Sequence, residues 1–433
     1  MASAKELIRL IESGQITPEF AVLYGPNQHL IDQQRKRYSC LIEKYMDHFG
    51  HEDVHLFSTP GRTEIGGNHT DHNHGRVLAA SVNLDSIAVA GKVVEPLITI
   101  YSEGFSEPFV VETTKLDMNK REKGTTTALV RGIAARFQEL GHRIGGFNAL
   151  ISSDVLIGSG LSSSASIEVL IGTILNSFYN ASRISPNEIA IIGQYTENNY
   201  FGKPCGLMDQ TACAVGGIIT IDFKDPQHLN VRKVNFDFAS RNYSLLVVDT
   251  GGSHADLTDD YASIPTEMKQ LANELNAGVA RELTLNDIID NMKALRKKVG
   301  DRAILRVLHF LGDNKRVLEQ VDALEQNRFD LFLQLVTESG NSSNKWLQNC
   351  YTIKDPTEQG VNLALALSEQ YIHKCGHGAC RVHGGGFAGT IQVFLPNEHV
   401  AGFLKMMQPI FGDSAVRVLN IRSVGTYQFY QNK

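Results

Sequence analysis

The chain has 433 residues, with 41 Lys and Arg against 47 Asp and Glu, so its formal net charge is −6. This length exceeds what one hydrophobic core usually organises and predicts two or three domains of roughly 150 residues each. Hydrophobic residues make up 42% and charged residues 20%, as in folded globular proteins, and no window approaches the roughly 20 apolar residues of a membrane span. The acidic balance does not favour nucleic acid or anionic lipid, so we expect a small-molecule partner, no nucleic acid and no membrane.

Cysteine usage indicates a reducing compartment. Six cysteines are scattered through a long chain, and the first residues lack the apolar core of a signal peptide, so a cytoplasmic protein is expected. One stretch is rich in possible zinc ligands: His373, Cys375, His377, Cys380 and His383. These residues do not have paired CxxC spacing, and we therefore interpret them as ordinary thiols and imidazoles.

The pattern along the chain predicts an α+β protein. Apolar residues at helical spacing indicate an N-terminal helical extension, residues 1–52. Short β-branched runs and longer amphipathic segments then predict strands at 54–58, 82–90, 97–101, 109–113 and 147–156 and helices at 125–140, 164–179 and 187–200.

The second half repeats this mixture. We expect an apolar β-branched run at 213–223, strands at 243–250, 378–395 and 415–424, and helices over 265–338 and 398–411. A Lys-Asp-Pro sequence at 224–226 interrupts these apolar runs, as is typical of a turn. The sequence therefore predicts two globular domains after the extension, at 53–228 and 229–433.

A glycine- and serine-rich junction at 154–168 joins an apolar strand to an apolar helix. Gly158 and Gly160 allow close backbone approach, and the helix start at 162–165 presents free N–H groups at the positive end of the helix dipole. The spacing is neither a Walker A loop nor GxGxxG. A flexible linker is the alternative, but the apolar flanks favour a loop that holds phosphate oxygens.

A polar run at 60–75 is expected to form a loop between two strands. Asn68, His69, Asp71 and Asn73 offer donors and acceptors suited to a polyhydroxylated ligand, and Arg62 adds a permanent cation. The histidines and Asp71 could instead hold a metal, but their spacing does not support closed coordination.

Two further stretches carry polar residues beside apolar strands. In the first, 203–210, Asp209 is either a structural cap or a carboxylate poised beside a cation such as Arg62. In the second, 381–390, consecutive glycines are consistent with a tight turn.

These four stretches, in this order, resemble the GHMP superfamily of small-molecule kinases and most closely its galactokinases. The resemblance extends from about residue 57 to the C-terminus. It implies two α+β domains with the active site in the cleft between them, and transfer of the γ-phosphoryl group of ATP to the anomeric hydroxyl of galactose. It also implies ATP and Mg²⁺ as cofactors, and we expect a monomer or a weak homodimer.

The resemblance also assigns roles to residues. Asp209 would be the catalytic carboxylate and Arg62 its cationic partner. The sugar site would contain Asn68, His69, Asp71, Gly206 and Tyr261. Ser164 and Glu197 would lie near Mg²⁺. The ATP-binding residues would be Gly158, Ser159, Gly160, Leu161, Ser162, Ser163, Ser164 and Ala165.

The chain departs from the galactokinase pattern in the polar run. Thr63-Glu64-Ile65-Gly66 stands where Val-Asn-Leu-Ile is usual, Asn68 replaces a Glu, and His72 replaces a Tyr. A neutral amide at 68 would change recognition at C6 of the sugar. Galactose is therefore expected, with galacturonic acid, N-acetylgalactosamine or arabinose as alternatives; a non-catalytic sugar and ATP sensor is the alternative from another class.

Overall fold

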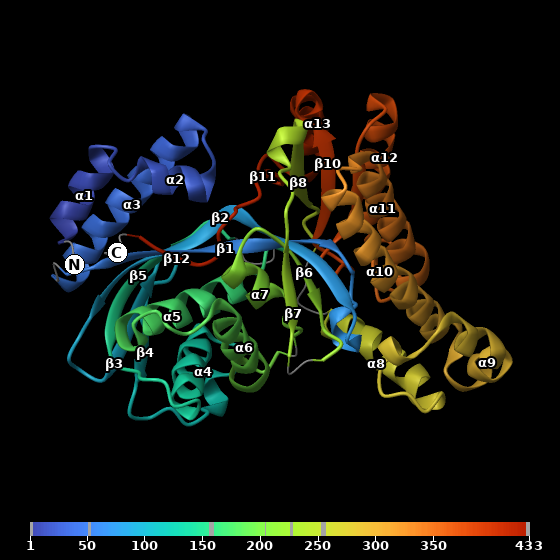
Figure 1. The fold of residues 1–433 in the computed structure, drawn as a ribbon, viewed down its shortest axis with the longest axis horizontal. Coiled ribbons are helices and arrows are strands. Elements are labelled where there is room, and N and C mark those ends of the chain that lie inside the picture. Colours follow the sequence, from blue (N-terminus) through green and yellow to red (C-terminus); the bar gives the residue numbers. More distant parts are fainter. Residues whose placement is uncertain are drawn as a thin grey trace.

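Two β-sheets and their covering helices make up the computed structural model, which describes residues 3–50, 53–155, 160–203, 205–225, 228–252 and 257–429 (Figure 1). The first sheet has eight strands: β1 (His55–Gly66), β2 (Arg76–Lys92), β3 (Leu97–Ser102), β4 (Phe109–Glu112), β5 (Phe147–Ser153), β6 (Ile218–Asp222), β7 (Asn230–Val234) and β12 (Tyr427–Gln428). The second has four: β8 (Tyr243–Asp249), β9 (Ala379–His383), β10 (Thr390–Pro396) and β11 (Val416–Leu419). These sheets confirm the predicted α+β fold.

The long strand β2 explains how the layers are arranged. Its side chains alternate between faces, so Ala88 and Ala90 face one core while Ile87 and Val89 face another. The first face is covered by α4 (Thr126–Glu139), α5 (Ser163–Asn180), α6 (Pro186–Thr196) and α7 (Met208–Val215). At one end the other face carries the N-terminal helices α1 (Ala4–Glu12), α2 (Thr17–Tyr24) and α3 (Gln28–Phe49) (Figure 1).

The second sheet is enclosed by helices on both faces. Leu245 and Val247 of β8 pack with α10 (Gly300–Glu325) and α11 (Phe329–Ser342), whereas Leu246 and Val248 pack with α12 (Gly360–Cys375) and α13 (Asn397–Phe411). The helices α8 (Thr258–Glu274) and α9 (Leu285–Lys298) extend beside α10 (Figure 1). No helix in the described part of the chain is long and apolar enough to cross a membrane.

Three features differ from the predicted elements or add to them. The prediction of a loop at 60–75 is wrong for its first part, because β1 continues through Gly66 in register with β2, with irregularities at Pro60/Arg62 and Glu64/Gly66. The run at 213–223 is split between the end of α7 and β6. Although β7 and β12 follow residue 228, they join the first sheet. The division at 228/229 stays a prediction.

A buried polar network attaches the N-terminal helices to the first sheet. The Asp85 carboxylate is fully buried and accepts hydrogen bonds from Arg37 at 2.7 Å, Tyr24 at 2.6 Å and Arg422 at 3.3 Å. Arg37 also pairs at 2.9 Å with Asp154, at the start of the glycine-rich junction. The N-terminal helices and the C-terminal segment therefore meet at Asp85, close to Asp154 at the start of the glycine-rich junction.

We expect Asp85→Asn to lower the free energy of unfolding by about 3–5 kcal/mol, because the buried Arg422 loses its carboxylate partner and Arg37 loses one of its two. Urea-induced unfolding followed by circular dichroism measures this loss. Asp290→Asn, an exposed aspartate on α9, is the matched control and should change stability by less than about 0.5 kcal/mol. Equal stabilities of the two variants would contradict a stabilising role for the network.

Candidate active site

An arginine and an aspartate from distant parts of the chain form the centre of the site. Arg62 lies on β1 and donates to Asp209, in the first turn of α7, from Nε to Oδ1 at 2.6 Å and from Nη2 to Oδ2 at 2.8 Å. The Arg62 side chain is 7% exposed, whereas that of Asp209 is 30% exposed. The guanidinium is thus buried behind a carboxylate that solvent, and a substrate, can reach.

The environment keeps Asp209 ionised. Enclosure by the protein would by itself raise its pKa, but the charge and hydrogen bonds of Arg62, with a further hydrogen bond from Ser162, lower the pKa below its usual range. Placement in the first turn of α7 adds a favourable interaction with the helix dipole. At neutral pH the site therefore presents a fixed negative charge.

The glycine-rich junction reaches the same carboxylate. Gly160 accepts a hydrogen bond from Arg62, and Ser162, the residue before α5, donates to Asp209. Ser162 adopts a left-handed conformation with φ 60°, which directs the chain into the helix. Gly158 and Ser159 lie outside the described residues.

The start of α5 has the geometry expected for binding anions. Leu161 is buried and its carbonyl accepts from the Arg62 backbone N–H at 3.1 Å, so the segment lies against β1. Ser163, Ser164 and Ala165 form the first turn of an 18-residue helix, where backbone N–H groups and the dipole favour negative charge. The ATP-binding role of these residues remains a prediction.

The hydroxyl oxygen of Ser164 and a carboxylate oxygen of Glu197 lie close together at the start of α5. Ser164 donates to Oε1 of Glu197 at 3.1 Å, and Lys203 contacts the same oxygen at 3.5 Å. Enclosure lowers the pKa of Lys203, but the charges of Glu197 and Asp209 outweigh it and raise that pKa. Sequence reasoning missed this cation, although Lys203 begins the stretch that contains Asp209. Within the described ranges, no group of three His, Cys, Asp or Glu side chains could hold a metal ion.

Glu197 also contacts the buried amide of Gln210, which in turn contacts a second acid, Glu168. The sequence analysis did not identify Gln210 or Glu168. Gln210 donates to Oε2 of Glu197 and to Oε2 of Glu168, both at 2.9 Å. Burial, and secondarily the charge of Glu197, raises the pKa of Glu168. Neither acid stands out in the sequence as part of a pair, because they are on different helical segments and meet only through packing.

The expected sugar residues divide into two groups. Asp71 lies against Gly206, where an added Cβ would be 1.7 Å from Asp71 Oδ2. His69 donates from Nε2 to the Gly385 carbonyl at 2.8 Å, and burial lowers its pKa to about 4, so the ring is neutral at pH 7. Tyr261 of α8 donates to the Gly386 carbonyl at 2.9 Å.

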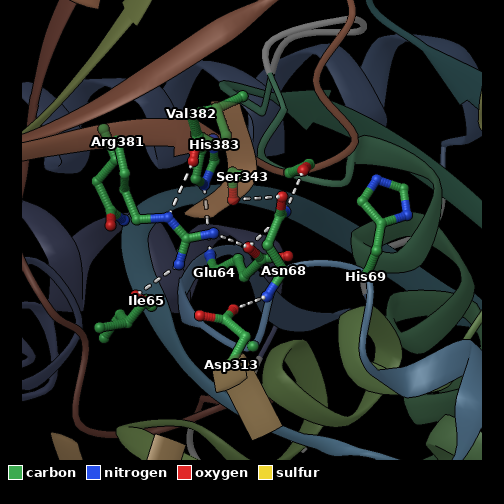
Figure 2. A network of polar contacts seen from close by, with 12 residues as sticks. Glu64, Ile65, Asn68, His69, Asp313, Ser343, Arg381, Val382 and His383 are labelled. Atoms are coloured by element: carbon green, nitrogen blue, oxygen red, sulfur yellow. Dashed lines mark hydrogen bonds and ion pairs between the residues drawn. The ribbon is translucent and has the colours of Figure 1, made fainter. Parts of the chain in front are cut away.

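Asn68 differs from the other expected sugar residues because it is fully buried. Its side chain faces the other half of the molecule and is surrounded by protein (Figure 2). The glycine-rich turn at 384–386 thus receives contacts from Asn68, His69 and Tyr261 and supports the segment that carries His69 and Asp71. Two of its glycines leave no room for a side chain, since a Cβ would lie 2.5 Å from the Tyr261 ring at Gly385 and 2.1 Å from the Asn349 carbonyl oxygen at Gly386.

Comparisons with known proteins agree with this fold. The family model "GHMP kinases N terminal domain" matches residues 128–217, and "Galactokinase galactose-binding signature" matches residues 43–92. The structure is similar to that of Methanococcus jannaschii mevalonate kinase, with a TM-score of 0.59 and 17% identity over 84% of this chain and 98% of the other. The fold is the one shared by small-molecule kinases of the GHMP type.

The similarity is greater to galactokinases. The galactokinase of Glaesserella parasuis is 29% identical over 84% of this chain and 91% of its own length, and that of Lactococcus lactis subsp. lactis is 28% identical over 86% and 91%. The fold matches that of L. lactis galactokinase complexed with galactose with a TM-score of 0.77 and 24% identity, covering 90% of this chain and 99% of the other. The resemblance to the galactokinases is therefore confirmed, and the protein is a sugar kinase.

We expect Gly206→Ala to raise the KM for the sugar roughly tenfold or more, because the new methyl group displaces the Asp71 carboxylate. The KM for ATP should stay within about twofold, and steady-state kinetics with each substrate varied in turn measures both. Gly312→Ala is the matched control, since an added Cβ in α10 meets only the end of Arg316, at 3.9 Å. An unchanged sugar KM in Gly206→Ala would remove Asp71 and Gly206 from the sugar site.

Proposed function

We propose that the protein transfers the γ-phosphoryl group of ATP to the anomeric hydroxyl of galactose, giving galactose 1-phosphate. One observation carries this proposal: the ionised Asp209 carboxylate is held by Arg62 from one side and by Ser162, at the start of α5, from the other. The acceptor and the phosphate donor would therefore meet beside one fixed carboxylate. The similarity to galactokinases over most of the chain supports galactose as the acceptor.

In this mechanism the anomeric hydroxyl donates a hydrogen bond to Asp209. The sugar oxygen forms a bond to the γ-phosphorus while the bond from that phosphorus to the ADP oxygen breaks. Because its pKa is lowered, Asp209 is a weak base, so it takes the proton late, once the forming bond has made the hydroxyl acidic. Arg62 keeps the carboxylate in place and offsets negative charge beside the transferring group.

The nucleotide phosphates would bind at the start of α5, with Gly160 and Ser162 to Ala165 on the protein side. Ser164 and Glu197 fit a magnesium ion, since octahedral coordination at about 2.1 Å separates neighbouring oxygens by about 3 Å and these two are 3.1 Å apart. When bound, Mg²⁺ neutralises phosphate charge. Lys203 would add a further cation on the same side.

We also propose a cytoplasmic location, supported by six free cysteines. A monomer or a weak homodimer remains our expectation. Among the alternative functions, a kinase for another galactose-configured sugar is favoured by the changed polar run. A non-catalytic sensor is less well supported, because Arg62, Asp209, Ser164 and Glu197 are all present and in contact as pairs.

We expect Asp209→Asn to lower kcat by about 10²–10⁴-fold, because the amide holds no negative charge and takes no proton. The affinity for ATP, measured by calorimetry, should stay within about threefold, since Asp209 lies on the acceptor side of the loop. The exposed Asp290→Asn variant again serves as control. Turnover close to that of the unchanged enzyme would contradict the role assigned to Asp209.

Acceptor specificity is tested by ADP release with ATP and Mg²⁺ across galactose, galacturonic acid, N-acetylgalactosamine, arabinose, glucose and fucose. The highest kcat/KM is expected for galactose. A higher value for another sugar would make the protein a kinase for that sugar. Absence of turnover with every sugar, together with ATP binding, would favour the sensor.

A further inference from the structure

Asn68 has used all its hydrogen-bonding capacity inside the protein. Its side-chain nitrogen donates to Glu64 Oε1 at 2.9 Å and to the Gly384 carbonyl at 2.7 Å. Its side-chain oxygen accepts from Asn349 at 2.8 Å and from Ser343 at 3.2 Å. A carboxamide has two N–H donors and two acceptor lone pairs, and the residue is 0% exposed, so nothing remains for a ligand.

The backbone of Asn68 is held as firmly as its side chain. Its N–H donates to Asp313 at 2.8 Å (Figure 2). Its carbonyl accepts from His309 Nε2 at 3.0 Å, and both partners are on α10. The next residue, His69, has a φ of 57°, a left-handed conformation that is unfavourable for a side chain larger than glycine. Contacts from the C-terminal half thus hold the strained backbone that leads to His69 and Asp71.

Glu64 connects Asn68 to a buried cation. Arg381 on β9 is fully buried and donates to Glu64 Oε1 at 2.6 Å, to the Ile65 carbonyl at 2.9 Å and to the Val382 carbonyl at 3.0 Å. Glu64 Oε1 therefore accepts from Arg381 and Asn68 together (Figure 2). Removal of this carboxylate would leave the buried Arg381 guanidinium without its ion-pair partner.

Glu64 and Asn68 are both positions at which this chain departs from the galactokinase pattern. Asn is usual in galactokinases at the position of Glu64, and Glu at the position of Asn68, so this chain has one acid and one amide at the same two places in reverse order. The structure puts the two side chains in direct contact.

We propose that Glu64, Asn68 and Arg381 form a clamp that positions the sugar-binding loop against the C-terminal half, and that Asn68 does not touch the sugar. The clamp rests on the proposed sugar kinase activity. Its three members are positioning residues, acting through His69 and Asp71. The sugar preference is then set by the residues that remain free to face the ligand.

The clamp is tested with Glu64→Asn, Asn68→Glu and the reciprocal double variant. Glu64→Asn removes the ion-pair partner of Arg381, and Asn68→Glu brings two buried carboxylates together. Each substitution should therefore lower Tm by roughly 5 °C and raise the KM for the sugar about tenfold. The KM for ATP and kcat should change less than about threefold. The double variant restores one acid and one amide and should recover at least half of the Tm loss and most of kcat/KM.

Glu64→Gln is the milder variant, because it keeps the size and hydrogen bonds of the side chain, and it should raise the sugar KM alone. Glu319→Gln, an exposed glutamate on α10, is the control and should change nothing. The ratio of kcat/KM for galactose over fucose should be the same in all clamp variants. A change in this ratio with Asn68→Glu that persists in the double variant, or additive effects of the two substitutions, would overturn the proposal.

The Tm measurements separate this proposal from the proposed function. If no sugar is phosphorylated, the kinase assignment fails, while recovery of Tm in the double variant still demonstrates the coupling of Glu64 with Asn68. If sugars are phosphorylated and the Tm losses add, the kinase assignment stands and the clamp is wrong.

Discussion

The structure of the site depends on the bidentate pair between Arg62 and Asp209. Enclosure alone would favour a protonated Asp209, and two charged hydrogen bonds from one guanidinium reverse that preference. A bidentate pair requires accurate placement of both side chains, so β1 and α7 must meet in one register. The third Arg62 nitrogen bonds to Gly160, which brings the phosphate loop to the same place.

A second constraint comes from the polar half of β1. Thr63 and Glu64 are buried, and buried polar groups destabilise a fold unless they are hydrogen-bonded. Their partners lie on the second sheet: Gln392 donates to Thr63 at 2.6 Å, and Arg381 donates to Glu64. The two halves must therefore close on each other, and the sugar loop that follows β1 is ordered by this closure.

The sequence predicts those parts of the site that depend on local pattern. The junction before α5 and the helix at 125–140 follow from spacing and residue type, whereas the residues alone left Asp209 open between a structural cap and a carboxylate beside a cation such as Arg62. The continuation of β1 through Gly66 could not be predicted, because polar residues are typical of loops and their partners come more than 300 residues later. Lys203, Gln210 and Arg381 were missed for the same reason: each takes its role from a contact that only packing creates.

These two constraints act on different parts of the proposed active site: the first on the Arg62–Asp209 pair, and the second on the loop that follows β1. Asp209 is held by Arg62 of β1 and by Ser162 before α5, both in the first half, while the adjoining Gly160 and Leu161 also lie against the second sheet. The loop with His69 and Asp71 is held from α10, β9 and the turn at 384–386. Substitutions on α10 or in the turn at 384–386 are therefore expected to act first on the loop with His69 and Asp71, the proposed sugar loop, and to leave the hydrogen bonds between Arg62 and Asp209 in place.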